Sequence, residues 1–272
     1  TSQDSMKIQI EENRKRTLCG SKIGGIPYWD KKREYPKDSD GSKLMLLAQM
    51  NLNEIPENQM LPRTGILQFF ILCDRNYGMA IQESGYPNNT YQVVYHEKID
   101  ESITEADVLS IGIKTTGDLE KENKSVNQQD SNCFPVRGEY AVSFKMEKAY
   151  MNDCDVRCDE LLHKIAEELG VELDSRLEFY QMFDEYDKKY VDIHESTYGH
   201  RMFGYPHFRQ WDPRGVEAAD YYDTLLFQLD SDYWKNQWRI LWGDAGVGAF
   251  FINSKKLEEL DFGDVLYSWD CH

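Results

Sequence analysis

The chain has 272 residues, 40% of them hydrophobic, so it can bury a sizeable core as one large domain or two small ones. It carries 48 acidic against 31 basic residues, a formal net charge of −17 at pH 7. This negative field repels phosphate backbones, which excludes nucleic-acid binding through a basic surface. A basic protein partner or dissolved cations would be attracted instead.

The composition also bears on the compartment. No apolar run is long enough to span a bilayer, and residues 1–10 lack the apolar segment of a signal peptide. The chain begins at Thr1 without an initiator Met, which leaves open a targeting segment upstream. Six scattered cysteines are too sparse for a disulfide scaffold, so we expect reduced thiols in a cytoplasmic protein.

Most of the predicted regular structure is β. Residues 6–10 alternate between apolar and polar side chains, as a half-buried strand does. Leu44–Asn51 and Ile66–Leu72 are almost continuously apolar, which is typical of strands buried on both faces. Tyr91–His96 and residues 140–146 are further strand candidates.

Two stretches in the middle of the chain read differently. Residues 114–132 are almost entirely polar, which predicts a surface loop or mobile excursion. Val156–Leu169 has an apolar stripe at helical spacing, with Asp155 as a candidate cap and Gly170 as a candidate end. The interval 153–192 holds thirteen acidic and five basic residues, which indicates a solvated acidic helix face and its flanks.

Trp238–Ile252 predicts a β-hairpin. Apolar side chains alternate in residues 238–242, and residues 243–246 supply turn chemistry before the return strand. Gly246 is expected at positive φ, and Gly248 indicates a bulge or another backbone passing close by.

Three short segments recur in the same order. Gly25-Ile26-Pro27 returns as Gly204-Tyr205-Pro206, Leu46–Gln49 as Leu225–Gln228, and Gly65–Ile71 as Gly246–Ile252, with displacements of 179, 179 and 181 residues. We infer two copies of one unit, at about 21–71 and 200–252, paired about a pseudo-two-fold within a single core. Gln49 should then superpose on Gln228, and Phe70 on Phe251.

The same segments resemble a known family. They are SKIGGIPYW, LLAQMNLNEIP followed by GILQFFI, HRMFGYP, LLFQLDSD, ILWGDAGVGAFFI and DFGDVLYSWDC. Together they are similar to the YwqG-like family, a widespread, mainly bacterial domain of unknown function, from Ser21 to Cys271. The resemblance implies a single β-rich α+β domain in the cytoplasm. It also implies a protein-binding or immunity-type role, because members are often found near toxin and immunity genes. It transfers no catalytic residue.

The acids of the second unit are candidate metal ligands. Asp230 and Asp232 flank Ser231 at the end of a predicted strand, and Asp244 lies in the predicted turn. If these strands are neighbours, the three carboxylates converge and bind a hard cation such as Mg²⁺ or Ca²⁺. Asp also favours strand ends and turns for local hydrogen bonding, and the first unit has Asn51 in place of Asp230.

A binding groove between the two units is a further hypothesis. Its candidate residues are Trp29, Trp211 and Trp242, with Asp270 near the C-terminus. Aromatic side chains of this size also fill protein cores, so burial is the alternative for each tryptophan.

The cysteines and histidines predict no metal centre. Cys154 and Cys158 stand one helical turn apart with His163 nearby, but zinc needs four ligands and no second pair has a recognisable spacing. We expect core or interface thiols. The three histidines His194, His200 and His207 match no helical metal motif. His200 aligns with Ser21 of the first unit, which predicts a structural position for it.

The sequence therefore predicts one α+β domain over residues 1–272, rich in β-sheet, internally duplicated and covered by peripheral helices. Its predicted function is a non-catalytic interaction module, of the toxin-immunity type, whose acidic surface meets a basic protein. The alternative is a metal-dependent hydrolase or other small-molecule enzyme that uses the second-unit carboxylates in a concave pocket. No cofactor, nucleic acid or membrane is expected to bind.

Overall fold

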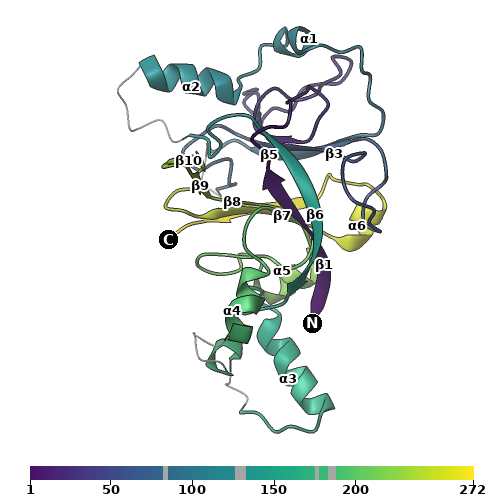
Figure 1. Cartoon of the computed structure of the whole chain (residues 1–272), viewed down its shortest axis with the longest axis vertical. Coiled ribbons are helices and arrows are strands. Elements are labelled where there is room, and N and C mark those ends of the chain that lie inside the picture. Colours follow the sequence, from purple (N-terminus) through teal and green to yellow (C-terminus); the bar gives the residue numbers. More distant parts are fainter. Residues whose placement is uncertain (82–84, 126–132, 175–177, 183–187) are drawn as a thin grey trace.

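The computed structural model describes residues 1–81, 85–125, 133–174, 178–182 and 188–272. Ten of the strands in these residues form one antiparallel sheet, and two more pair with each other (Figure 1). The strands are β1 (Ser2–Ile10), β2 (Lys22–Ile23), β3 (Met45–Asn51), β4 (Ile66–Ile71), β5 (Tyr91–His96), β6 (Tyr140–Tyr150), β7 (Arg201–Met202), β8 (Thr224–Asp230), β9 (Asp232–Trp234), β10 (Gln237–Ile240), β11 (Val247–Ile252) and β12 (Val265–Asp270). The helices are α1 (Glu105–Leu109), α2 (Thr116–Ser125), α3 (Cys158–Glu168), α4 (Lys188–Glu195), α5 (Gly215–Tyr221), α6 (Ser254–Glu258) and the 3₁₀ helix η1 (Phe179–Met182).

The strand order of the large sheet is β12-β11-β8-β7-β1-β6-β2-β3-β4-β5, and β9 pairs only with β10. The sheet is nearly closed: its end strands approach one another, and the rings of Tyr91 on β5 and Tyr267 on β12 are 5.2 Å apart. The chain is thus a single β-rich domain with few helices. None of the helices in the described residues is long and apolar enough to cross a membrane.

The curled sheet encloses the main core. Phe69 on β4 stacks on Phe227 on β8 with ring centroids 4.5 Å apart, and Phe250 on β11 packs against both. Every residue of β4 and β11 is buried, so the prediction of strands buried on both faces is confirmed for β4. Burying each of these rings contributes roughly 1.5–3 kcal/mol, which makes the contact between the two ends of the sheet a large part of its stability.

Two buried glutamines fasten loops to the sheet in the same way. Gln49 on β3 and Gln228 on β8 each donate to two carbonyl groups before the preceding short strand (β2 or β7) and accept from an amide after that strand. The partners are Leu18 O, Gly20 O and Tyr28 N for Gln49, and Thr197 O, Gly199 O and His207 N for Gln228. These bonds satisfy backbone groups that would otherwise be buried without partners.

The polar stretch predicted as a loop contains a helix. α2 begins after Thr115, whose hydroxyl and amide both hydrogen-bond the carboxylate of Asp118. The amide of Asp118 donates back to the Thr115 hydroxyl, so the cap is reciprocal. The helix that it starts carries little apolar surface, and apolar periodicity therefore does not predict it. Residues 126–132, the rest of the predicted loop, lie outside the described residues.

The next helix is shorter than predicted at its start. α3 begins at Cys158, and the side chain of Asp155 does not cap it because it forms ion pairs with Arg157 and Arg214. Its end is confirmed: Gly170 has φ 68° and donates to Glu167 O, as in a helix that closes with a left-handed glycine.

The predicted hairpin is wrong. β10 pairs with β9, because both edges of β11 are already occupied by β8 and β12. The chain between β10 and β11 instead places the indole of Trp242 against β11. A Cβ on Gly248 would lie 2.5 Å from that ring. Gly248 therefore makes room for an indole rather than for another backbone.

Gly246 is needed for space and not for a positive φ. The positive φ angles of the turn fall at Gly243 (49°) and Ala245 (55°), so the conformation predicted for Gly246 is wrong. A Cβ on Gly246 would lie 1.8 Å from the carbonyl oxygen of Asp270, a backbone atom that cannot move without breaking the pairing of β12.

We predict that Gly246→Ala destabilises the protein by about 1–3 kcal/mol, the usual cost of overpacking. Urea unfolding followed by tryptophan fluorescence measures the change. The matched control is Gly117→Ala in α2, where the new Cβ would lie 3.6 Å from the hydroxyl of Thr115, an ordinary contact, and the helix gains a better helix former. An unfolding midpoint unchanged in Gly246→Ala would contradict the crowding.

Candidate functional site

The second-unit acids form arginine pairs. Asp230 is buried and accepts from Arg209 (3.3 Å), from Ser231 N (2.8 Å) and from Gly199 N (3.1 Å). Asp232 binds Arg239 through two hydrogen bonds of 2.8 and 2.9 Å. Each carboxylate is thereby held by a fixed cation of the protein itself.

These acids do not gather into a ligand set. Asp244 is exposed in the turn before β11. Within the described ranges, the group of three or more potential ligands whose atoms lie within 4.8 Å of one another is a different one, Asp153, Cys154 and His194. His200 has the structural role expected of it, since its Nδ1 accepts from the amide of Asp230.

The candidate groove residues are distributed over different parts of the fold. Trp29 and Trp242 are buried in two separate core clusters. Trp211 is 70% exposed, in the loop before α5. Asp270 accepts hydrogen bonds from the amides of Arg209 and Gln210, so it fixes the loop that carries Trp211.

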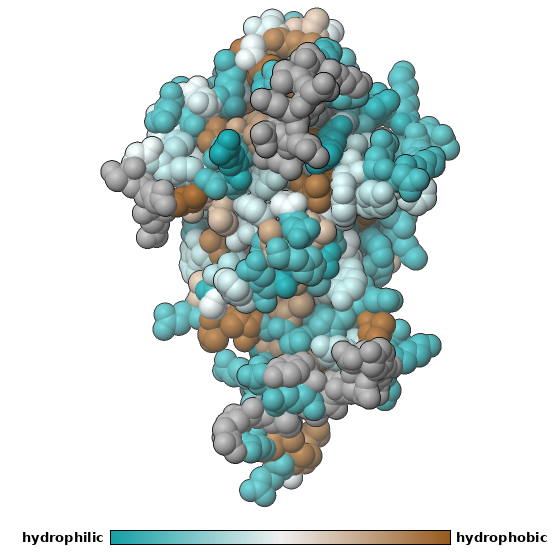
Figure 2. All heavy atoms as spheres, turned by 90° about the vertical axis from the view of Figure 1, so that its left-hand side faces the viewer, coloured by the Kyte–Doolittle hydropathy of each residue, from teal (hydrophilic) through white to brown (hydrophobic). Residues whose placement is uncertain are grey.

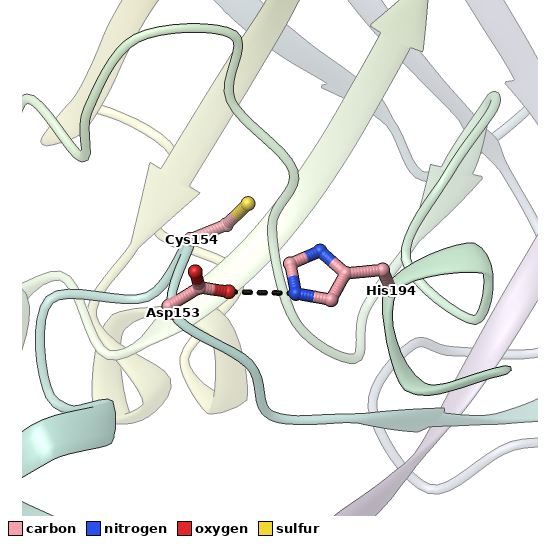
Figure 3. A group of neighbouring side chains, drawn as sticks. All are labelled: Asp153, Cys154 and His194. Carbon is pink, nitrogen blue, oxygen red and sulfur yellow. Dashed lines mark ion pairs between the residues drawn. The ribbon is translucent and has the colours of Figure 1, made fainter. Parts of the chain in front are cut away.

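A cluster that the sequence did not predict lies where α4 meets the end of β6. Asp153 and Cys154 follow β6, and His194 is on the last turn of α4 (Figure 3). His194 Nε2 is 2.7 Å from Asp153 Oδ1. The Tyr190 ring packs on the His194 ring at 4.3 Å, and its hydroxyl is 3.4 Å from Asp153 Oδ2. Side chains from two elements are thus held together.

His207 approaches the same thiol from the loop after β7. Its Nδ1 is 3.6 Å from Cys154 Sγ, and the Tyr198 ring lies 4.4 Å from its ring. The backbone amide of His207 donates to Gln228, which fixes the position of the loop. Carboxylate, thiol and two imidazoles therefore meet from three segments of the chain.

The electrostatics do not favour a cysteine nucleophile. Burial raises the pKa of the Cys154 thiol to about 11 and lowers the pKa of His207 to about 3. Both groups are therefore neutral near pH 7, whereas a reactive cysteine is a thiolate beside a positive partner. Burial is the largest influence on the pKa of Asp153 and raises it, but the hydrogen bond and charge of His194, together with further hydrogen bonds, outweigh burial and leave the pKa lowered.

Sequence spacing did not identify the contacts of Cys154. The helical pattern linked it to Cys158 and His163, but Cys154 precedes α3 and Cys158 is buried within it. The partners that the structure shows are His194 and His207, 40 and 53 residues along the chain. Only the return of the chain through α4 and β7 brings them together.

The helix beyond this cluster has an apolar surface of its own. Figure 1 shows α3 and α4 projecting from one end of the sheet, and Figure 2 shows hydrophobic atoms among hydrophilic ones at that end. Leu169 is 74% exposed, Val171 51% and Ile165 37%. The exposed acids Glu167, Glu168 and Glu172 lie beside them in the chain. We call these six residues, which lie at the end of α3 and directly after it, the α3 surface.

The comparisons with known proteins establish the family. Residues 21–271 match the family described as Domain of unknown function (DUF1963), which is most of the chain. The protein belongs to this family. A search of curated proteins found no match, so neither comparison transfers an activity to this DUF1963 chain.

The DUF1963 domain also contains a pair of touching thiols. Cys73 follows β4 and Cys133 precedes β6, and their sulfur atoms are 2.7 Å apart. The hydrogen bond from Cys73 lowers the pKa of Cys133 to about 7, with a smaller contribution from the positive charge of Lys114. The same contact raises the pKa of Cys73. All six cysteines are free in the structure.

We predict that iodoacetamide alkylates Cys133 faster than Cys154 or Cys158 at pH 7. Burial raises the pKa of Cys154 to about 11 and of Cys158 to about 12, whereas the Cys133 thiolate forms as the pH passes about 7. Peptide mass spectrometry at a series of pH values measures the three rates. Cys73→Ala removes the hydrogen bond and should move the Cys133 profile to higher pH. A Cys133 profile unaffected by Cys73→Ala would contradict this pairing.

Proposed function

We propose that the protein is a non-catalytic interaction module that binds a basic amphipathic segment of a protein partner through the α3 surface. The observation that carries the proposal is Leu169, which ends an apolar helix stripe and is 74% exposed directly after Glu167 and Glu168. Leaving a leucine side chain in water forgoes roughly 1.5–3 kcal/mol of burial. Apolar residues grouped on a surface in this way mark sites of interaction.

The charge of the same segment selects the partner. Residues 158–174 contain six acidic residues and one lysine. A partner segment with Lys or Arg on one face and aliphatic side chains on the other would complement both properties. Part of the predicted acidic interval is not available for this, because Asp155 is buried against two arginines. Asp184 and Glu185, two further acids of that interval, lie outside the described residues.

An immunity-type role is compatible with this proposal, with a basic toxin as the partner. The alternative of a metal-dependent hydrolase has less support. Its carboxylates Asp230 and Asp232 are held by Arg209 and Arg239, and Asp244 is not gathered with them.

We also propose that the chain arose by internal duplication. The support is the mirrored strand order on the two sides of β1 and β6, together with the matching bonds of Gln49 and Gln228. Lys22 pairs with Gln49, and Arg201 with Gln228, at the same displacement of 179 residues. An experimental structure in which residues 21–71 and 200–252 do not superpose would contradict it.

Two further properties of the protein are proposed on the basis of its sequence. They are membership of the YwqG-like family within DUF1963 and a cytoplasmic location. Fractionation of the native cell tests the location, and recovery in a membrane or secreted fraction would contradict it.

The binding proposal can be tested with a defined probe, a fluorescent 18-residue amphipathic helix made of Lys and Leu. Fluorescence anisotropy measures its dissociation constant. We expect Leu169→Ser to weaken binding at least fivefold, because an apolar anchor is lost. Replacing Glu167, Glu168 and Glu172 with Gln should weaken binding and reduce its dependence on salt, since screening acts on exposed charge.

Matched control variants distinguish binding by the α3 surface from attraction to the acidic protein as a whole. Leu109→Ser removes another exposed leucine, which is 43% exposed at the end of α1. Replacing the exposed Glu97, Glu101 and Glu258 with Gln removes the same number of charges elsewhere. Both controls should bind like the unmodified protein. Equal weakening by the controls would show attraction to the whole acidic molecule and would contradict the α3 surface.

A further inference from the structure

We propose that Asp153, Cys154, His194 and His207 bind one zinc ion, which ties α4 and the loop after β7 to the end of β6. This inference is independent of partner binding by the α3 surface. It concerns a site at the base of the projecting helices, whereas the partner surface lies at the far end of α3.

The donor set selects the class of metal. Thiolate, imidazole and carboxylate together suit zinc, which is almost always bound by four such groups in a tetrahedral structural site. Mg²⁺ and Ca²⁺ prefer oxygen ligands and would make little use of Cys154 or the two histidines. The acids of the second unit, which the sequence suggested for a hard cation, are at a different place in the fold.

The distances already approach those of a zinc site. With Zn–S about 2.3 Å and Zn–N about 2.0 Å, a tetrahedral angle places sulfur and nitrogen about 3.5 Å apart. The observed distance from Cys154 Sγ to His207 Nδ1 is 3.6 Å. The potential ligand atoms of Asp153, Cys154 and His194 lie within 4.8 Å of one another, and Asp153 and His194 would exchange their contact of 2.7 Å for coordination. His207 lies outside this group of three and meets it through Cys154, so its loop would move towards Asp153 and His194 when all four bind one ion.

His207 provides a second, separate indication of a ligand. It is 5% exposed, and its Nε2 is buried without a hydrogen-bond partner among the residues that the structure describes. Its Nδ1 meets only the weak donor and acceptor Cys154 Sγ in this region. Burial of an imidazole with so little hydrogen bonding is costly. Coordination through Nδ1 would replace its weak contact with Cys154 Sγ by a metal bond and would leave the ring proton on Nε2.

The surroundings hold the ligands in place. Tyr190 packs on His194 and Tyr198 packs on His207, so neither imidazole can turn freely. Four protein ligands would leave no open position, which is the arrangement of a structural site. Bound zinc would thus stabilise the attachment of the projecting helices and would not activate water.

Cobalt substitution tests the site directly, because tetrahedral Co²⁺ has intense visible bands and a thiolate ligand adds a charge-transfer band in the near ultraviolet. The metal-free protein, prepared with a chelator and kept reduced, is titrated with Co²⁺ and then with Zn²⁺. We expect one equivalent of Co²⁺ to produce both features and one equivalent of Zn²⁺ to remove them. Zn²⁺ should also raise the melting temperature of the full chain.

Two substitutions locate the ion. Cys154→Ser should abolish the charge-transfer band, and His207→Gln should weaken metal binding at least tenfold while its backbone bond to Gln228 remains. The controls Cys158→Ser and Cys73→Ser should leave the spectrum unchanged. Absence of any bound metal would overturn the proposal. So would a charge-transfer band that survives Cys154→Ser but is lost in Cys73→Ser, which would place the metal at the other thiol pair.

Discussion

The pairing of β1 with β6 is the interaction on which the rest of the fold depends. Nine residue pairs, from Ser2 with Tyr150 to Ile10 with Val142, join the two strands at the centre of the sheet. Each strand then bonds to a short strand on its other side, β1 to β7 and β6 to β2. β1 precedes β2 in the chain but bonds to β7, and β6 precedes β7 but bonds to β2. Each side of the sheet is thus completed by a strand from the other part of the chain, so the two sides form one cooperative unit.

This arrangement determines where the projecting helices leave the sheet. β6 runs through the centre and delivers Asp153 and Cys154 to one end, while the chain returns through α4 and His194 to β7. The returning chain passes close to Asp153 and Cys154, and this brings carboxylate, thiol and imidazole together. The sheet thus fixes the base of the helices, and the acidic and apolar residues of α3 extend into solvent.

The sequence predicted features that depend on local pattern or on complete burial. The strand at Ile66–Ile71 and the end of α3 at Gly170 were found because continuous apolar residues and a left-handed glycine have local causes. The pairing of β10 with β9 was missed because the occupancy of the edges of β11 is a property of the whole sheet. The Cys154 cluster was missed for a similar reason, since its histidines come from distant segments.

Hydrogen–deuterium exchange with and without the Lys/Leu helix tests the central claim, that a rigid sheet presents the α3 surface to a basic partner. The account predicts slower exchange on binding in residues 158–174 and no change in β1 or β6. Protection centred instead on the groove of about 800 Å³ that Gln3, Asn58 and Phe203 help to line would contradict it.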